Sequence, residues 1–261
     1  MYASFKEILS QFSAGEFVMV LDEHRECEAD FFILAEHITP EKINFLLHNA
    51  RGMICVACDE SIPQKLNIPL MVEKNGSAHG TNFCVSVDAA KDITTGISAF
   101  DRARTIGLLA DPKTRPEDFV LPGHTFPLIA KDIKKRFGHT EAAVELALAS
   151  QKYPVVVICE ILNERGEKAN KEELLLLAKK LNCPLTTLEE LQKNFMLRTG
   201  KHYFSHFFLF LFLPCLRQIF RDTNCRSGRS RLWDRAPCSK SDGYLKSEDS
   251  VFRILLEKRW C

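Results

Sequence analysis

Residues 17–35 read FVMVLDEHRECEADFFILA and contain the clearest strand pattern in the first part of the chain. The apolar runs at 17–21 and 31–35 each have the length and composition of a buried strand. Between them, five of the nine residues from Asp22 to Asp30 are acidic. The stretch therefore predicts two buried strands joined by a strongly acidic segment.

The flanking sequence alternates between strand and helix patterns. Apolar residues keep helical spacing over 5–12, and Gly15 closes that helix. Caps or first-turn residues predict four more helices, which begin at Thr39-Pro40, Thr140, Asn170 and Thr187. Apolar runs predict further strands at 53–58, 83–87 and 155–159. This alternation predicts an α/β or mixed α+β fold.

Composition limits the function classes that the chain can belong to. The 261 residues are 46% hydrophobic, and 35 Lys and Arg nearly balance 34 Asp and Glu. This balance argues against a general nucleic-acid binder, which needs a large basic excess. Ten scattered cysteines and an N-terminus with Lys6 and Glu7 predict free thiols in a reducing cytoplasm.

The last part of the chain has a different pattern from the first. Residues 1–197 have the periodicity of a globular domain, whereas 198–261 form a Phe-rich and then basic tail. The apolar run 204–220 is interrupted by His206, Pro214 and Arg217, and it is short for a membrane span. We expect an irregular, poorly ordered tail without membrane association, although a membrane-surface anchor is an alternative.

The acidic segment is the first candidate site. If residues 26–30 are extended, Glu26, Glu28 and Asp30 project from one face. Like charges this close need compensation, and a divalent cation such as Mg²⁺ with oxygen ligands supplies it. The alternative is a solvated acidic turn between two hairpin strands.

The second candidate is RFGHTE at 136–141, which opens a helix. Free N–H groups and the positive dipole end of a helix bind anions, phosphate in particular. Arg136 adds paired donors, Thr140 adds a hydroxyl, and His139 can bind metal or move protons. The alternative is an ordinary capped helix with a surface Arg and His.

Four weaker signals complete the set. Glu160 directly follows the strand at 155–159, where a carboxylate is well placed for acid–base work. A Pro-Gly turn before His124 can present its ring rigidly. Residues 94–102 offer hydroxyls and amides as an anion cradle, or are ordinary loop. The CxxC at 55–58 lacks a second pair at zinc spacing, so we expect no metal there.

The order of these motifs resembles one family closely. The sequence runs VMVLD (18–22), RECEAD (25–30), MVEKN (71–75), VSVDAA (85–90), TTGISAFDR (94–102), PGH (122–124), RFGHTEA (136–142) and CE (159–160). Over about residues 4–195 this resembles 3,4-dihydroxy-2-butanone-4-phosphate synthase. The resemblance implies a lyase that converts D-ribulose 5-phosphate to 3,4-dihydroxy-2-butanone 4-phosphate and formate in riboflavin biosynthesis.

The resemblance also implies the assembly and the roles of individual residues. The expected fold is a central mixed sheet packed with helices, in a homodimer with active sites at the interface and two Mg²⁺ or Mn²⁺ ions per site. By resemblance, Glu26 and His139 are metal ligands. The expected catalytic residues are His124, Glu160, Asp22 and Glu28. The expected substrate-binding residues are Arg25, Glu26, Asp30, Thr95, Arg136, Gly138, His139, Thr140 and Glu160.

Several positions depart from the family pattern. Cys27 and Ala29 stand where Asn and Gly are common, and His79 replaces an aromatic residue. Leu121 replaces a common Arg, and Phe137 replaces the first Gly of Gly-Gly-His. These departures keep open the alternative of a catalytically weak paralogue that binds a sugar phosphate or a protein partner. The tail shows no zinc-ligand cysteine cluster, so we expect no GTP cyclohydrolase II domain and a monofunctional chain.

Overall fold

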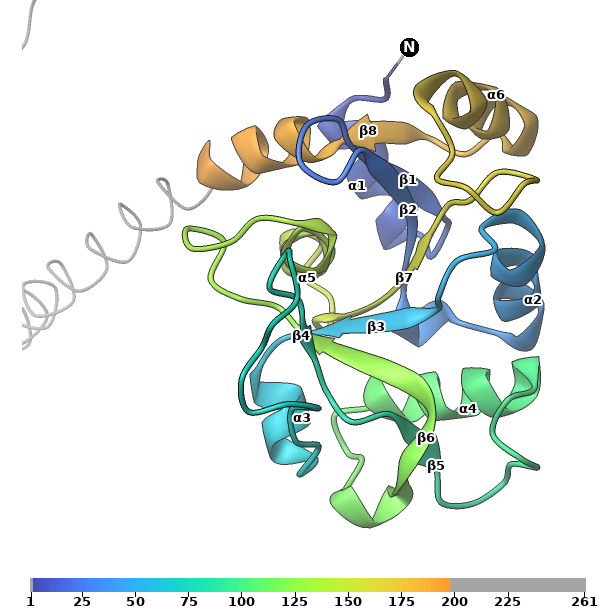
Figure 1. The fold of residues 1–261 in the computed structure, drawn as a ribbon, viewed down its shortest axis with the longest axis vertical. Coiled ribbons are helices and arrows are strands. Elements are labelled where there is room, and N and C mark those ends of the chain that lie inside the picture. Colours follow the sequence, from blue (N-terminus) through green and yellow to red (C-terminus); the bar gives the residue numbers. More distant parts are fainter. Residues whose placement is uncertain (1, 198–261) are drawn as a thin grey trace, which may run out of the picture. The chain divides into compact units, whose positions relative to one another are not determined.

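The structure is a computed structural model that describes residues 2–197. An eight-stranded mixed sheet lies between two layers of helices (Figure 1), as the α/β prediction requires. The strands are β1 (Val18–Asp22), β2 (Glu28–Leu34), β3 (Cys55–Cys58), β4 (Asn82–Phe83), β5 (Val87–Ala89), β6 (Phe119–Ile129), β7 (Val155–Glu160) and β8 (Leu185–Thr187). The helices are α1 (Phe5–Ser13), α2 (Pro40–Asn49), α3 (Ser61–Lys65), α4 (Ala99–Leu109), α5 (His139–Ala149) and α6 (Lys171–Leu181), followed by a helix over 188–197.

The sheet order brings distant parts of the sequence side by side. The strands run β4-β6-β3-β7-β2-β1-β8, and β5 pairs with β6. The β3–β6 and β1–β8 pairs are parallel, and the other pairs are antiparallel. The two apolar runs that open the sequence are neighbours, with Val20 opposite Asp30. On its other side, β2 pairs with β7, with Asp30 opposite Glu160.

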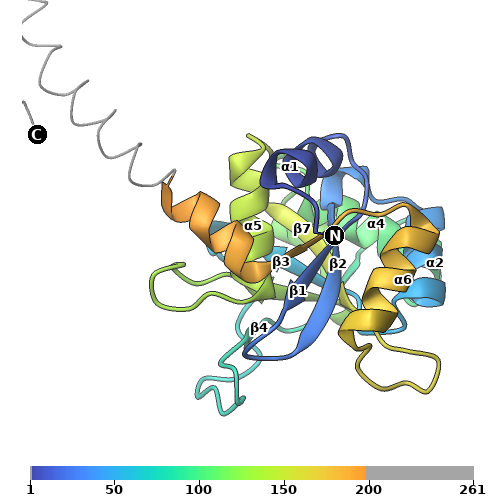
Figure 2. The same cartoon turned by 90° about the horizontal axis from the view of Figure 1, so that it is seen from above.

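The central strands bury both of their faces because each face meets a helical layer. One core packs side chains such as Phe31 and Val157 against α2, α4 and α6. The other packs side chains such as Phe32 and Ile158 against α1, α5 and the helix over 188–197. Figure 2 shows α1 and α5 on one side of the strands and α2, α4 and α6 on the other. Continuous apolar runs are expected for strands covered on both sides.

Local capping confirms some predicted boundaries and corrects another. Thr39 caps α2 and Asn170 caps α6 through their side chains, as predicted. The prediction that Thr140 caps its helix is wrong, since α5 begins at His139 with Gly138 as the N-cap residue. A carboxylate of the first turn, that of Glu141, accepts the Gly138 N–H, so no hydroxyl cap is needed.

The remaining differences follow from strand pairing. The strand predicted over 83–87 is two short strands, β4 and β5, which pair with separate parts of β6. The predicted Pro122-Gly123 turn is part of β6, where the pairing with β5 jumps from Thr125 to Val120. The intervening residues bulge out of the ladder. The helix predicted over 187–191 begins after Thr187, the last residue of β8, and continues to 197.

Among residues 2–197, no helix is long and apolar enough to cross a membrane. The predictions for the tail at 198–261 fall outside the described residues. The domain boundary and the cytoplasmic location stay predictions.

The packing of α1 on the sheet allows a test of the core. Phe12 is completely buried, whereas Leu176 on α6 is 70% exposed. We expect Phe12→Ala to lower the free energy of unfolding by about 3–5 kcal/mol, because it leaves a cavity. The matched control Leu176→Ala should change it by less than about 0.5 kcal/mol. Urea unfolding of both variants measures the difference, and equal costs would contradict this packing.

Candidate active site

Strand register aligns several predicted site residues across one face of the sheet. Asp30 lies directly opposite Glu160. On β3, Cys55 pairs with Ile158 of β7 and with Phe126 of β6. Met53 precedes Cys55 by two residues, so the same registers place it beside Glu160 on one side and His124 on the other. A hydrogen bond from the Met53 N–H to Glu160 Oε2, at 2.8 Å, confirms the first of these alignments.

This row lies on the side of the sheet that faces α5. Side chains at i and i+2 of a strand share a face, so Asp30 and Glu160 share theirs with Phe32 and Ile158. Those two residues belong to the core packed against α5. The first residue of α5, His139, thereby meets the carboxylates of β2.

The Asp22 side chain binds the backbone of the loop between β1 and β2, residues 23–27, which we call the acidic loop. This side chain is buried at the end of β1 and accepts three backbone N–H groups, from His24, Arg25 and Glu26, at 2.9–3.1 Å. Burial disfavours its charge, but these three donors lower the pKa of Asp22 below its usual value. The carboxylate therefore holds residues 24–26 in a turn at the end of β1, and its catalytic role stays a prediction.

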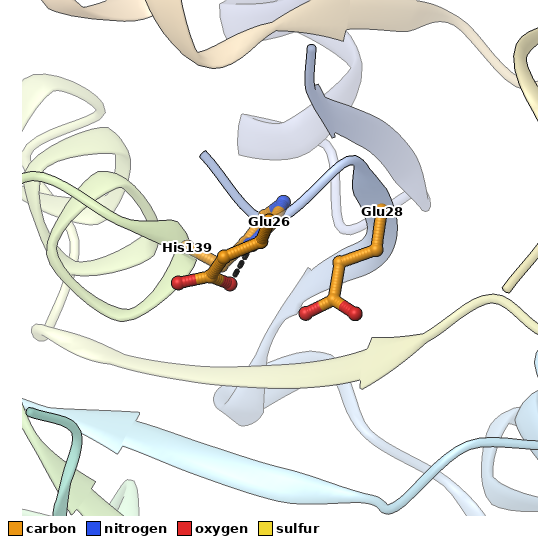
Figure 3. Close-up of side chains that lie close together, drawn as sticks. All are labelled: Glu26, Glu28 and His139. Carbon is orange, nitrogen blue, oxygen red and sulfur yellow. Dashed lines mark ion pairs between the residues drawn. The ribbon is translucent and has the colours of Figure 1, made fainter. Parts of the chain in front are cut away.

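Three groups at the loop form a compact cluster (Figure 3). Ligand atoms of Glu26, Glu28 and His139 all lie within 4.8 Å of one another. Positive φ at Cys27 interrupts the extended chain that the sequence predicted over 26–30. The carboxylates of Glu26 and Glu28 nevertheless lie close together, as the distances within the cluster show.

His139 is held in the orientation that a metal ligand needs. Its ring is 5% exposed, and Nε2 donates to the Val20 carbonyl oxygen at 3.1 Å. Nδ1 then faces Glu26 Oε2 at 3.5 Å. A backbone acceptor on one ring nitrogen fixes the tautomer and leaves the other nitrogen for a metal. Carboxylate oxygens and one imidazole nitrogen fit a divalent cation.

The charges of this cluster depend on one another. Burial opposes the positive charge on His139, but Asp30 and Glu26 outweigh it and raise the pKa of His139 to about 9. The hydrogen bond with His139 is in turn the main reason that the pKa of Glu26 lies well below its usual value. Burial and the neighbouring Glu26 raise the pKa of Glu28. The imidazolium thus supplies positive charge where a metal ion fits.

Asp30 is the deepest carboxyl of the site. It is 3% exposed, and its Oδ1 has no hydrogen-bond partner within the described part of the chain. Burial is the largest cause that raises the pKa of Asp30 to about 7. A carboxyl with this pKa can give or take a proton near neutral pH.

Two guanidinium groups meet beside Gly138. A Cβ at Gly138 would lie 2.3 Å from Arg25 Nη2 and 3.3 Å from both terminal nitrogens of Arg136. Arg136 is held by Glu141, by the His79 carbonyl and by Thr81 Oγ1. Converging cations at the start of an 11-residue helix suit a phosphate group.

Other predicted residues take clear positions. The Thr94 and Gly96 amides in the proposed cradle donate to Asp101, so these two groups are not open to an anion, while Thr95 stays a prediction. Cys55 and Cys58 belong to opposite cores, so they cannot share one metal ion.

Phe137 does not distort the loop that carries Gly138. It has no positive φ, and its ring packs 6.3 Å from that of Phe195. The backbone therefore does not need a glycine at this position.

The sequence interpretation gave no role to several residues that hold the site together. The Asp88 carboxylate is hydrogen-bonded to Nδ1 of His124. The Glu141 carboxylate accepts the N–H groups of Lys131 and Gly138 and so holds the segment 131–138. Both lie within the motifs quoted above, which was the available signal. Lys168 Nζ donates to the Glu26 carbonyl at 2.7 Å, and Lys171 Nζ donates to Glu23 at 2.7 Å. No sequence pattern pointed to these two lysines.

A cluster of two glutamates and a buried imidazole lies near paired guanidiniums, and these groups suit a divalent cation and a phosphate group, as in an enzyme active site. Comparison with known proteins identifies the family. The family model for 3,4-dihydroxy-2-butanone 4-phosphate synthase matches residues 6–194. The chain belongs to this family.

Individual curated relatives of similar sequence support this family membership. A 3,4-dihydroxy-2-butanone 4-phosphate synthase of Neisseria meningitidis serogroup B is 46% identical over 188 residues, which cover 71% of this chain and 52% of that relative. The riboflavin biosynthesis protein RibBA of Bacillus subtilis is 46% identical over 194 residues, 73% of this chain and 48% of that one. The chain thus spans about half the length of these curated relatives.

A solved structure also matches. A crystal structure of 3,4-dihydroxy-2-butanone 4-phosphate synthase in complex with two magnesium ions has a TM-score of 0.68 and 38% sequence identity. The match covers 73% of this chain and 95% of that one. The mixed-sheet fold predicted from the resemblance is therefore confirmed.

The buried Asp30 predicts a pH dependence of stability. Its pKa is about 7 in the folded protein, above the ordinary 3.8, so the folded state binds the extra proton between these values. In metal-free protein, this group lowers the stability as pH rises through that window, by up to about 1.4 kcal/mol per pH unit, and no further above it. Asp30→Asn removes the contribution, so its stability relative to wild type should increase from pH 4 to pH 8.

Urea unfolding in EDTA across this range measures the effect. Asp92→Asn is the control, because Asp92 is an exposed aspartate whose side chain is 77% accessible. Its curve should run parallel to that of the wild type. A parallel curve for Asp30→Asn would contradict the raised pKa of this buried carboxyl.

Proposed function

We propose that the chain is a metal-dependent lyase that converts D-ribulose 5-phosphate to 3,4-dihydroxy-2-butanone 4-phosphate and formate. The observation that carries this proposal is the position of two guanidiniums over Gly138, beside the Glu26–His139 pair. The two products together contain all the atoms of the substrate, so no oxidant or reductant is needed. Family membership over residues 6–194 supports the assignment.

The phosphate end of the substrate would be bound by Arg25, Arg136 and the start of α5, where Gly138 leaves room and Thr140 adds a hydroxyl. Arg136 uses three of its N–H donors within the protein and so has a fixed direction. Binding energy from the phosphate can then orient carbon atoms that lie farther along the substrate. Thr95 is the further residue that we assign to substrate binding.

Glu26 and His139 would hold a divalent metal, Mg²⁺ or Mn²⁺, and Glu28 lies close enough to take part. A bound divalent metal polarises carbonyl and hydroxyl oxygens and lowers the cost of an enediolate. The magnesium-bound relative supports Mg²⁺ and a pair of ions. Because His139 carries a proton near neutral pH without metal, metal binding must release that proton.

The carboxylates would carry the proton transfers that the carbon-skeleton change requires. Asp30 and Glu160 lie opposite each other on adjacent strands, and the raised pKa of Asp30 suits an acid or a base. Met53 N–H fixes Glu160, and Gly52 permits the approach, because a Cβ there would lie 2.8 Å from Glu160 Oε2. Glu28 would act from the start of β2 and Asp22 from the end of β1, Asp22 chiefly by positioning the acidic loop between them.

We also propose a homodimer with its active sites at the interface. His124 lies two strands from Glu160, a separation of about 10 Å at normal strand spacing. Exposed apolar side chains come from the same region, namely Ile97, Phe100, Val120 and Leu121. We propose that these four side chains form an apolar patch, because contiguous exposed apolar surface is typical of a protein interface. His124 would then complete the site of the partner subunit.

Within residues 2–197, no structural feature favours the alternative of a catalytically weak paralogue. Phe137, which motivated it, packs on Phe195 instead of filling the space at Gly138. Leu121 is 40% exposed within the apolar patch, which suits an interface.

Formate release tests the reaction directly. The full chain, given D-ribulose 5-phosphate with ¹³C at C4 and Mg²⁺, should release labelled formate, and EDTA should abolish the release. Glu26→Gln should lower the rate at least about 100-fold, because it removes a charged ligand of the metal. Folded protein that releases no labelled formate with Mg²⁺ or Mn²⁺ would contradict the assignment.

Mixing two inactive variants tests the shared site. Glu26→Gln and His124→Gln damage different regions of the chain. If each site uses Glu26 of one subunit and His124 of the other, half of the dimers in an equal mixture are mixed and have one intact site. The mixture should then recover about a quarter of the wild-type activity. A mixture no more active than the separate variants would place each site within a single chain.

A further inference from the structure

His124 has a buried partner that the family motifs leave without a role. Asp88 Oδ2 lies 2.7 Å from His124 Nδ1, and Asp88 Oδ1 accepts the His124 backbone N–H at 2.9 Å. The Asp88 side chain is 7% exposed, whereas that of His124 is 42% exposed. The Asp88 carboxylate is therefore hydrogen-bonded to both the ring and the backbone N–H of the half-exposed His124.

The backbone around this pair is arranged to permit the close approach. A Cβ at Gly96 would lie 2.1 Å from Asp88 Oδ2 and 2.5 Å from His124 Nδ1, and Gly96 has φ of +96°. A Cβ at Gly123 would lie 2.1 Å from the Val87 backbone. The Gly96 turn is itself fixed by Asp101, which accepts its N–H at 3.0 Å. Gly96 and Gly123 leave the space that the Asp88–His124 hydrogen bond needs, and Asp101 holds the Gly96 turn in place.

The hydrogen bond determines which ring nitrogen of His124 carries the proton. A carboxylate can only accept, so Nδ1 must be the donor when the ring is neutral. The lone pair then lies on Nε2, the nitrogen at the other edge of the ring. A histidine in this tautomer can take a proton through Nε2, and the carboxylate stabilises the imidazolium that forms.

We propose that Asp88 is a positioning residue that fixes the ring and the tautomer of His124, so that Nε2 acts as the proton acceptor in the lyase reaction. The part concerning catalysis rests on the proposed function, whereas the tautomer stands on the geometry alone. Asp88 would act only through His124, without contacting the substrate.

The isosteric variant Asp88→Asn makes a sharp test. Its amide oxygen should stay on the His124 backbone N–H, since that site needs an acceptor. The amide NH₂ then faces Nδ1 as a donor, so the ring proton must move to Nε2. Replacing an acceptor by a donor behind a catalytic histidine traps the wrong tautomer and lowers kcat strongly.

The experiment combines NMR and kinetics on the full chain. ¹⁵N-histidine-labelled protein gives the tautomer from the two ring nitrogens, with the His124 signals assigned by their loss in His124→Gln. Wild type should show Nδ1–H, and Asp88→Asn should show Nε2–H. The kcat of formate release should fall at least about 100-fold in Asp88→Asn, with KM changed less than about threefold.

The control and the outcomes separate this proposal from the proposed function. Asp92→Asn changes an exposed aspartate on the same segment and should leave both tautomer and kcat unchanged. If wild type shows mainly Nε2–H, or if Asp88→Asn keeps both its tautomer and its kcat, the proposal is overturned. If wild type releases no formate, the proposed function fails, yet the tautomers still decide the role of Asp88. If Asp88→Asn does not fold, the wild-type tautomer decides.

Discussion

The site depends on one electrostatic balance, between the buried ring of His139 and the carboxylates around it. Burial alone would keep this histidine neutral, but Asp30 and Glu26 raise its pKa to about 9. The charged ring in turn permits Glu26 to stay ionised where it is half-buried. A divalent cation would replace the proton in this balance. The positive charge of the His139 ring thus lies at the start of α5, where a metal ion would lie, and Nε2 of the ring is hydrogen-bonded to the Val20 carbonyl.

The sheet supplies the geometry that this balance requires. The β1–β2 pairing brings Val20 opposite Asp30, and the β2–β7 pairing brings Asp30 opposite Glu160. A shift of one residue in either register would turn these side chains toward the other helical layer. The apolar residues on both faces of β2 prevent such a shift, because Phe31 and Phe32 each fill a different core. Core packing thereby fixes the active-site geometry.

Much of this arrangement could be predicted from local sequence, and the failures have physical causes. Continuous apolar runs identified β1, β2 and β7, and side-chain caps identified the starts of α2 and α6. The start of α5 was misplaced because Glu141, not a preceding hydroxyl, satisfies Gly138. The roles of Lys168 and Asp88 depend on contacts across 142 and 36 residues, which no local pattern encodes. The family motifs indicated which residue types form the site, but only the fold showed which side chains hydrogen-bond to one another there.

We propose that the acid cluster and His139 form one divalent-metal site. Anomalous diffraction from a crystal of the full chain grown with Mn²⁺ tests it most directly. We expect a manganese peak at coordination distance from a carboxylate oxygen of Glu26 and from Nδ1 of His139, with the hydrogen bond from Nε2 to the Val20 carbonyl intact. A peak elsewhere in an ordered crystal, or ligation of His139 through Nε2, would contradict it.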